Sequence, residues 1–243
     1  MEMKELNDLV ELAREAEDKK TFIAGDQTWF IDGDGSANRI KETCVPERKV
    51  ELHTLTGLLD YIQSEQSGLD KPRLRIDSPT RVYFEGALDK YGRRATEAVA
   101  EFQAPGFAFE NFYGQEEMNI ALQSRFVSTP DREILLKVIG NLQESEVKQA
   151  SDDGVSQQVQ IKSGVASVAD VKVPNPVSLA PYRTFLEVEQ PISKFIFRMR
   201  SGMQSAIFEA DGGMWKIEAT QKVKKYLEDE LKSRDLNAIK VIA

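Results

Sequence analysis

Side chains that often carry catalysis are scarce in this sequence. One histidine, His53, and one cysteine, Cys44, occur among its 243 residues. A zinc site built from histidine and cysteine ligands needs more of these side chains than one chain holds. A Ser-His or Cys-His nucleophile would have to use His53, although a histidine at the start of a helix is more typically a structural hydrogen-bonding group. Acid-base chemistry is therefore left to carboxylates, lysines and tyrosines.

Carboxylates that could hold a divalent metal lie in short turns. These turn aspartates are Asp32, Asp34, Asp152, Asp153 and Asp211. Metal-assisted hydrolysis needs two or three such groups converging on one ion. They belong to separate turns, however, and aspartate beside glycine is ordinary turn chemistry. We therefore predict no catalytic residue, no metal site and no cofactor site.

The turn that begins at Asp32 does not fit the calcium loop of EF-hand proteins. The sixth position of that loop requires glycine and the twelfth requires a bidentate glutamate. Ala37 and Thr43 stand at those positions. This segment is therefore predicted to be a plain loop.

Basic and aromatic residues alternate with apolar ones in residues 72–102. Period two over short runs, with turns between them, predicts an antiparallel meander with one wet face. Basic groups beside aromatic rings on a sheet are how several single-strand binders hold the backbone and bases together. Our predicted contacts with nucleic acid or a partner on this face are Arg73, Arg75, Arg81 and Tyr83. Acids of the same face offer cross-strand pairing as the alternative: Asp77, Glu85, Glu97 and Glu101.

The densest strand signal lies in residues 176–200. Two runs flank a tight turn at residues 190–193, and pairing them sets Val188 against Phe195 and Leu186 against Phe197. The other face then sets Glu189 against Lys194. Because one register creates an apolar face and an opposite-charge pair, we predict a central β-hairpin.

Two arginines of this central segment complete the predicted contact set. Arg183 and Arg198 are selected for charged contacts with nucleic acid or a protein partner. The alternative is that they pair with Glu187, Glu189 and other nearby acids. Exposed charge on a half-buried sheet is commonly only solvation.

Helical periodicity alternates with the strand signals along the chain. Apolar stripes predict helices at residues 3–18, after Thr54, around residues 118–138 and from residue 215 to 231. We therefore predict an α+β fold, mostly antiparallel β-sheet with packed helices and a long C-terminal helix. The expected parts are an N-terminal α+β part with the meander, residues 1–141, and C-terminal β-hairpins plus the long helix, residues 142–243. A single domain without a clean boundary is the alternative.

Composition limits the classes of partner. Forty acidic residues against 32 basic ones give a net charge of −8, which disfavours non-specific attraction to DNA or an anionic membrane and leaves room for a local basic patch. No run of 18 apolar residues occurs and the first residues are polar, so we expect neither membrane insertion nor secretion. The lone Cys44 cannot form an internal disulfide, which predicts a reducing, cytoplasmic setting.

Three segments resemble a family of phage and prophage proteins of unassigned function, the YfdQ-like family. They are SPTRVYFEG, the run from SDDGV to FIFRMR, and IFEADGGMWKIEA. The resemblance covers roughly the C-terminal two thirds of the chain and is densest between residues 152 and 215. It implies a phage origin, action in the host cytoplasm and a gene placed among those of early DNA metabolism and recombination. It implies no catalytic residues.

The resemblance and the residues together predict a non-enzymatic, self-associating phage protein. Its expected role is binding nucleic acid during phage DNA metabolism or recombination, or binding a host factor. Copies of the chain are expected to associate into a homo-oligomer. The alternatives are a structural protein of virion assembly, whose terminal strand could cross to a neighbour, and a metal-dependent carboxylate enzyme.

Overall fold

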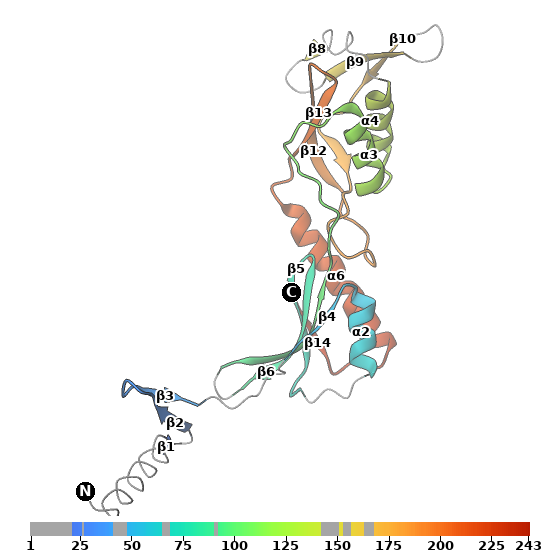
Figure 1. The fold of residues 1–243 in the computed structure, drawn as a ribbon. Helices are drawn as coiled ribbons and strands as arrows, with labels where there is room; N and C mark the ends of the chain where they lie inside the picture. The colour runs from blue at the N-terminus through green and yellow to red at the C-terminus, as the bar shows by residue number, and fades with distance from the viewer. Residues whose placement is uncertain are drawn as a thin grey trace, which may run out of the picture. The chain divides into compact units, whose positions relative to one another are not determined.

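The computed structural model describes residues 21–25, 27–40, 48–64, 69–89, 92–141, 151–152, 157–162 and 168–243. The chain divides into two compact units. The first holds residues 1–46 and 88–94, and the second holds residues 47–87 and 95–243. Each unit has its own elements, which are labelled in Figure 1.

The first unit contains a small antiparallel sheet in the order β1-β2-β3. Its strands are β1 (Thr21–Ala24), β2 (Gln27–Ile31) and β3 (Ala37–Arg39). Gly25 adopts a positive φ of 66° in the β1–β2 turn, where glycine is favoured.

A five-stranded mixed sheet forms one part of the second unit, in the order β14-β5-β6-β7-β4. Its strands are β4 (Val50–Leu52), β5 (Arg73–Ser78), β6 (Arg81–Leu88), β7 (Arg94–Glu101) and β14 (Lys240–Ile242). β5 and β6 are antiparallel, whereas β14 runs parallel to β5 and β4 runs parallel to β7. The meander strands predicted in residues 72–102 are present, and two parallel edge strands extend them.

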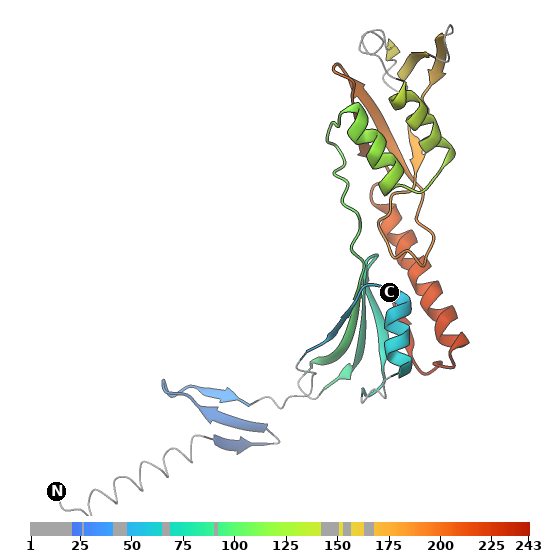
Figure 2. The ribbon, with the colours of Figure 1, turned by 45° about the vertical axis from the view of Figure 1, so that its right-hand side comes forward.

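Helices α2 (Leu55–Ser64) and α6 (Met214–Ser233) cover one face of this sheet (Figure 2). Apolar residues of both helices and of β5, β6 and β7 share one core, among them Leu58, Leu74, Phe84 and Val223. The Thr54 hydroxyl accepts the Gly57 N–H at 3.0 Å and caps α2 as predicted. The long C-terminal helix, 20 residues, is confirmed as well.

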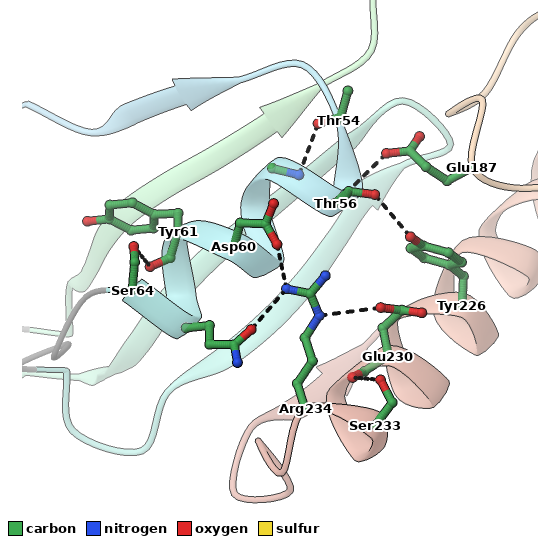
Figure 3. A network of polar contacts seen from close by, with 12 residues as sticks. Thr54, Thr56, Asp60, Tyr61, Ser64, Glu187, Tyr226, Glu230, Ser233 and Arg234 are labelled. Carbon is green, nitrogen blue, oxygen red and sulfur yellow. Dashed lines mark hydrogen bonds and ion pairs between the residues drawn. The ribbon is translucent and has the colours of Figure 1, made fainter.

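Polar side chains join α2 to α6 on the outside of this core (Figure 3). Arg234 donates to Asp60 at 2.6 Å and to Glu230 at 3.3 Å. The Thr56 hydroxyl lies 3.1 Å from the Tyr226 hydroxyl. The Asp60 hydrogen bond and the nearby Glu230 raise the pKa of Arg234 against the opposing effect of burial, so this arginine stays charged.

A second antiparallel sheet, in the order β11-β12-β13, forms another part of the same unit. Its strands are β11 (Val177–Leu179), β12 (Ser193–Arg200) and β13 (Gln204–Glu209). Helices α3 (Gln115–Arg125) and α4 (Pro130–Gly140) contribute to its core with Met118, Leu122, Leu135 and Val138. This core includes residues on both sides of position 141, and the domain boundary expected there stays a prediction.

A third antiparallel sheet, in the order β10-β9-β8, consists of β8 (Ser151–Asp152), β9 (Gln157–Lys162) and β10 (Val168–Lys172).

The predicted central hairpin is wrong in its first strand. β12 forms as expected, but its partners are β11 and β13, and residues 180–192 form neither helix nor strand. Phe185 and Val188 are buried in the core of the five-stranded sheet, whereas Leu186 is 64% exposed. Val188 was therefore correctly predicted to be a core residue, although its core is not that of Phe195 and Phe197, and the prediction for Leu186 is wrong.

One side chain holds this irregular segment together. The Gln190 carbonyl oxygen accepts the N–H groups of Arg183 and Thr184 at 3.0 and 3.2 Å. Its amide nitrogen donates to the carbonyl oxygens of Thr184, Phe185 and Val188 at 3.1–3.3 Å. A buried side-chain amide thus satisfies the backbone groups that a strand ladder would otherwise pair.

The fold is α+β, as predicted, with antiparallel and mixed sheets and a long C-terminal helix. The described part of the chain contains no helix that is both long and apolar enough to cross a membrane.

Candidate nucleic-acid interface

The structure brings the predicted meander residues together on one sheet face. Arg73, Arg75, Arg81 and Tyr83 alternate with the buried residues of β5 and β6, so they point away from the helices. Arg73 pairs with Glu85 in the strand register, and Arg75 pairs with Tyr83. We call these four residues and their acidic neighbours Asp77, Glu85 and Glu101 the paired face.

Glu85 is the centre of the paired face and is only 2% exposed. Its carboxylate accepts the Arg73 Nε–H at 2.9 Å and the Arg75 Nε–H at 3.2 Å. Arg75 also donates to Asp77 at 2.6 Å and lies 4.6 Å from the centroid of the Tyr83 ring. The hydrogen bond to Asp77, followed by the contacts with Glu85, raises the pKa of Arg75 against the opposing effect of burial.

The remaining arginine of this face is also matched by an acid. Arg81 of β6 forms an ion pair with Glu101 of β7. This hydrogen bond and the charge of Glu101 raise the pKa of Arg81. The paired face thus holds its positive charge beside carboxylates, which is the cross-strand pairing that the sequence left open.

The outward face of β11–β13 has a different composition. Along β12, residues at odd positions from Ser193 to Met199 are buried, and Lys194, Ile196, Arg198 and Arg200 alternate with them. The strand register places Phe208 of β13 opposite Ile196. Lys194 and Arg200 are exposed, while Ile196, Arg198 and Phe208 are half-buried. We call these five residues, together with Phe112, the basic face.

One cation of the basic face lies against an aromatic ring, and another contacts a hydroxyl group. The Arg200 guanidinium is 4.0 Å from the centroid of the Phe112 ring, and its Nε–H donates to Gln204 at 2.7 Å. The Phe112 and Phe208 rings meet edge to face with centroids 6.3 Å apart. Lys194 donates to the Ser178 hydroxyl at 2.8 Å. These contacts position the cations with neutral partners.

No acidic residue occupies an outward position of β11, β12 or β13, all of which the structure describes. Glu209 ends β13 but shares the register position of the inward-facing Phe195. Its carboxylate is bound by Arg183 at 2.9 Å. The basic face therefore differs from the paired face in lacking carboxylates of its own strands.

Arg183 does not lie on either face. It is 7% exposed, donates to Ser193, and lies 3.9 Å from Asp211 and 4.1 Å from the centroid of the Trp215 ring. Burial lowers the pKa of Arg183 to about 10, although Glu209 and Asp211 act in the opposite direction. The cluster links the end of β13 to the start of α6. Ion pairing within the chain is therefore the alternative to the predicted contact of Arg183 with nucleic acid or a partner.

The acids that the sequence offered as alternatives for Arg183 have other partners. Glu187 accepts the Thr56 N–H at 3.1 Å, and Glu189 accepts from Lys222 at 2.9 Å. Arg198 lies on the basic face and donates to the Phe197 carbonyl oxygen at 3.4 Å. The predicted contact set is therefore divided between the paired face, the basic face and a buried cluster.

The remaining chemistry-bearing residues are placed in structural roles or lie outside the described residues. His53 Nδ1 is 3.2 Å from the Glu101 carbonyl oxygen. Asp32 accepts the N–H groups of Asp34 and Ser36 at 3.0 and 2.9 Å. The hydrogen bond from Ser36 is the main cause of the lowered pKa of Asp32. Cys44 and Asp153 lie outside the described residues. Among the described residues, no group of three or more His, Cys, Asp or Glu side chains is arranged to hold a metal.

The signal for the basic face was present in the sequence. Residues 193–200 alternate apolar and basic positions, and Lys194, Arg198 and Arg200 share one parity. The predicted hairpin instead paired Lys194 with Glu189. The strands that pair with β12 determine which charges surround it, and its predicted partner strand was wrong.

No protein-family model, curated protein or solved structure matches this chain. The resemblance to the phage family therefore stays a prediction that rests on the three sequence segments. The case for function rests on the geometry and charge of the two sheet faces.

Proposed function

We propose that this chain is a non-enzymatic, self-associating phage protein that binds single-stranded nucleic acid in the host cytoplasm. The observation that carries the proposal is the basic face. It presents Lys194, Arg198 and Arg200, of which Arg200 lies against the Phe112 ring, and no outward position of its three described strands is acidic. The resemblance to a phage family supports the setting in phage DNA metabolism or recombination.

Phosphate and base recognition both fit this arrangement. Cations such as Lys194 and Arg200, whose contacts are with neutral groups, release the counterions of a nucleic-acid backbone when they bind it. Phe208 and Phe112 supply aromatic surface on which an unstacked base can lie, and such stacking contributes about 1–3 kcal/mol per base. A single strand exposes its bases for this contact, whereas a duplex hides them. A net charge of −8 requires the attraction to be local.

Binding of a fluorescent single-stranded oligonucleotide, followed by anisotropy over a series of salt concentrations, tests the proposal. Lys194→Glu and Arg200→Glu should each weaken binding by about tenfold at low salt, since each reverses a charge near the phosphates. Loss of one phosphate contact should also reduce the slope of log K against log salt by about 0.7.

The matched control is Arg81→Glu on the paired face. It makes the same charge change on an outward sheet position, but the arginine it removes is already paired with Glu101. Affinity should fall much less than in the basic-face variants. Equal losses in all three variants, or wild-type binding that does not depend on salt, would contradict assignment to the basic face.

A structural role in assembly is the second candidate, and a separate observation favours it. The β1–β3 sheet carries Phe22, Ile23, Phe30 and Ile31, yet none of its residues is buried. A sheet of this size gains stability by covering an apolar face. Native mass spectrometry of the full chain tests self-association directly, and a monomer at every concentration would contradict it.

A further inference from the structure

Arg183 joins two strands of the basic face at the end where no turn connects them. Its guanidinium donates to the hydroxyl of Ser193, the first residue of β12. It also donates to the carboxylate of Glu209, the last residue of β13, at 2.9 Å. At the other end of the pair, residues 201–203 form the turn that links β12 to β13 covalently. One side chain therefore bridges what we call the open end of this strand pair.

Two residues of the basic face lie directly beside these bridged positions. Lys194 follows Ser193 on β12. Phe208 precedes Glu209 on β13. The Ala210 N–H donates to the Lys194 carbonyl oxygen at 3.0 Å, so the two strands are still hydrogen-bonded here. Because side-chain direction in a strand follows the backbone, the way in which Lys194 and Phe208 face outward depends on how this end is held.

The position of Arg183 is fixed from several sides. The residue is only 7% exposed, and its guanidinium lies 4.1 Å from the centroid of the Trp215 ring and 5.6 Å from that of Phe195. The Gln190 side chain accepts its backbone N–H at 3.0 Å. A side chain buried in this way offers almost no surface to a phosphate group, so it is better placed to act on the interface from behind.

We infer that Arg183 is a positioning residue of the nucleic-acid interface, which holds the open end of β12 and β13 so that Lys194 and Phe208 face the nucleic acid together. This role rests on the proposed function and adds to it a residue that does not touch the nucleic acid. A guanidinium suits the role because its separate nitrogens bind two partners at fixed angles. The ammonium group of lysine carries the same charge on a single nitrogen and lacks this fork.

Arg183→Lys tests the inference, because it keeps the charge and removes the fork. The full chain is titrated with a fluorescent single-stranded oligonucleotide, and we expect affinity at low salt to fall by about threefold. The slope of log K against log salt should fall by about 0.7, since the phosphate contact of Lys194 is lost. If Arg183 bound phosphate directly as a charge, the lysine variant would preserve both quantities, and that result would overturn the inference.

A double-mutant cycle separates positioning from general damage to the fold. In a Lys194→Ala background, Arg183→Lys should cost much less affinity, because a contact that Arg183 positions is already missing. In an Arg200→Ala background the full loss should remain, since Arg200 lies beside the covalent turn at the other end of the strand pair. Equal losses in the two backgrounds would overturn the inference.

Arg132→Lys is the matched control on helix α4, which packs on the same core. The Arg132 side chain is 11% exposed, and its Nε–H donates to the Leu122 carbonyl oxygen at 2.7 Å. This variant should lose stability without any change in affinity or in the salt slope. A loss of affinity equal to that of Arg183→Lys would show that general destabilisation, and not positioning, explains the effect.

Ser193→Ala keeps the test decisive if Arg183→Lys does not fold. It removes one partner of the guanidinium and leaves the arginine in place, and affinity should again fall together with the salt slope. Unchanged binding by Ser193→Ala would overturn the positioning role while the proposed function stands. Wild-type protein that shows no salt-dependent binding would overturn the proposed function and the positioning role with it.

Discussion

Two sheets of the second unit each bury one face under helices and turn arginines outward on the other. On the paired face, Glu85 binds Arg73 and Arg75, and Glu101 binds Arg81. On the basic face, Arg200 lies against a phenylalanine ring and Lys194 binds a serine hydroxyl. The comparison teaches that outward arginines are not equivalent, because the neighbouring strand decides whether their charge is neutralised.

This difference separates stability from recognition. A carboxylate that is buried between two guanidinium groups holds the strands together. If either partner were removed, the other would remain as a buried charge without compensation. Cations that are held by neutral groups, as Lys194 and Arg200 are, contribute little to folding and keep their attraction for anions. We therefore assign a structural role to the paired face and a binding role to the basic face in the proposed function.

The largest effect is expected from removing the central carboxylate of the paired face. Glu85→Gln leaves Arg73 and Arg75 beside an uncharged amide, and we expect the free energy of unfolding to fall by about 3 kcal/mol in urea titration. Glu101→Gln is the control, since its pair with Arg81 is exposed to solvent and its loss should lower the free energy of unfolding far less. Equal losses in the two variants would break the distinction between a buried and an exposed pair.

A smaller effect should follow from releasing cations on the paired face. In the double variant Asp77→Asn and Glu101→Gln, Arg75 and Arg81 lose acidic partners while Glu85 stays in place. We expect oligonucleotide affinity to rise about threefold at low salt and to return to the wild-type value at high salt. No gain at low salt would show that charge pairing is not what separates the two faces.

The smallest effect concerns acid stability of the buried Arg183 cluster. Burial by itself raises the pKa of Asp211, but hydrogen bonds from Ser193 and Gly213 and the charge of Arg183 outweigh it and leave the pKa below its usual value. A lowered folded-state pKa contributes stability above the unfolded-state pKa, near 3.8, that is lost as pH falls through the folded-state pKa.

Unfolding measured between pH 5 and pH 2, an interval of about three units around the ordinary carboxyl pKa, checks this expectation. Wild type should lose stability more steeply on acidification than Asp211→Asn, which has no carboxylate to protonate. The same slope in both chains would show that Asp211 does not sense the charge of Arg183. That result would place Arg183 closer in behaviour to the arginines of the basic face.

Local pattern predicted much of the fold. Helix α2 begins after the Thr54 cap, and its buried residues Leu55, Leu58 and Leu59 are those of the predicted stripe. The alternation of Leu74 and Ile76 with arginines places the right residues in the core of the five-stranded sheet. These features depend on spacing within one element, where side-chain direction follows from helix and strand geometry.

Contacts between segments far apart in the chain were harder to predict from the sequence. The contacts of Gln190 with the backbone from Arg183 to Val188 replace a strand that the pattern favoured. Glu209 and Asp211, which surround Arg183, follow it by more than twenty residues and occupy the end of another strand and the turn beyond it. Alternation of apolar and polar residues predicts strands. It does not predict an irregular segment whose backbone is hydrogen-bonded by one of its own side chains, as Gln190 does here.

The amino-acid sequence by itself determined which side of each strand a residue occupies, since successive side chains point to opposite faces. It therefore placed Arg73, Arg75 and Arg81 on one surface. Only the tertiary structure decided that carboxylates of adjacent strands neutralise them, and that β13 offers Arg198 and Arg200 no acid at its outward positions. The physical reason is that side-chain direction is set by local backbone geometry, whereas the electrostatic environment is set by strand pairing between segments far apart in the chain.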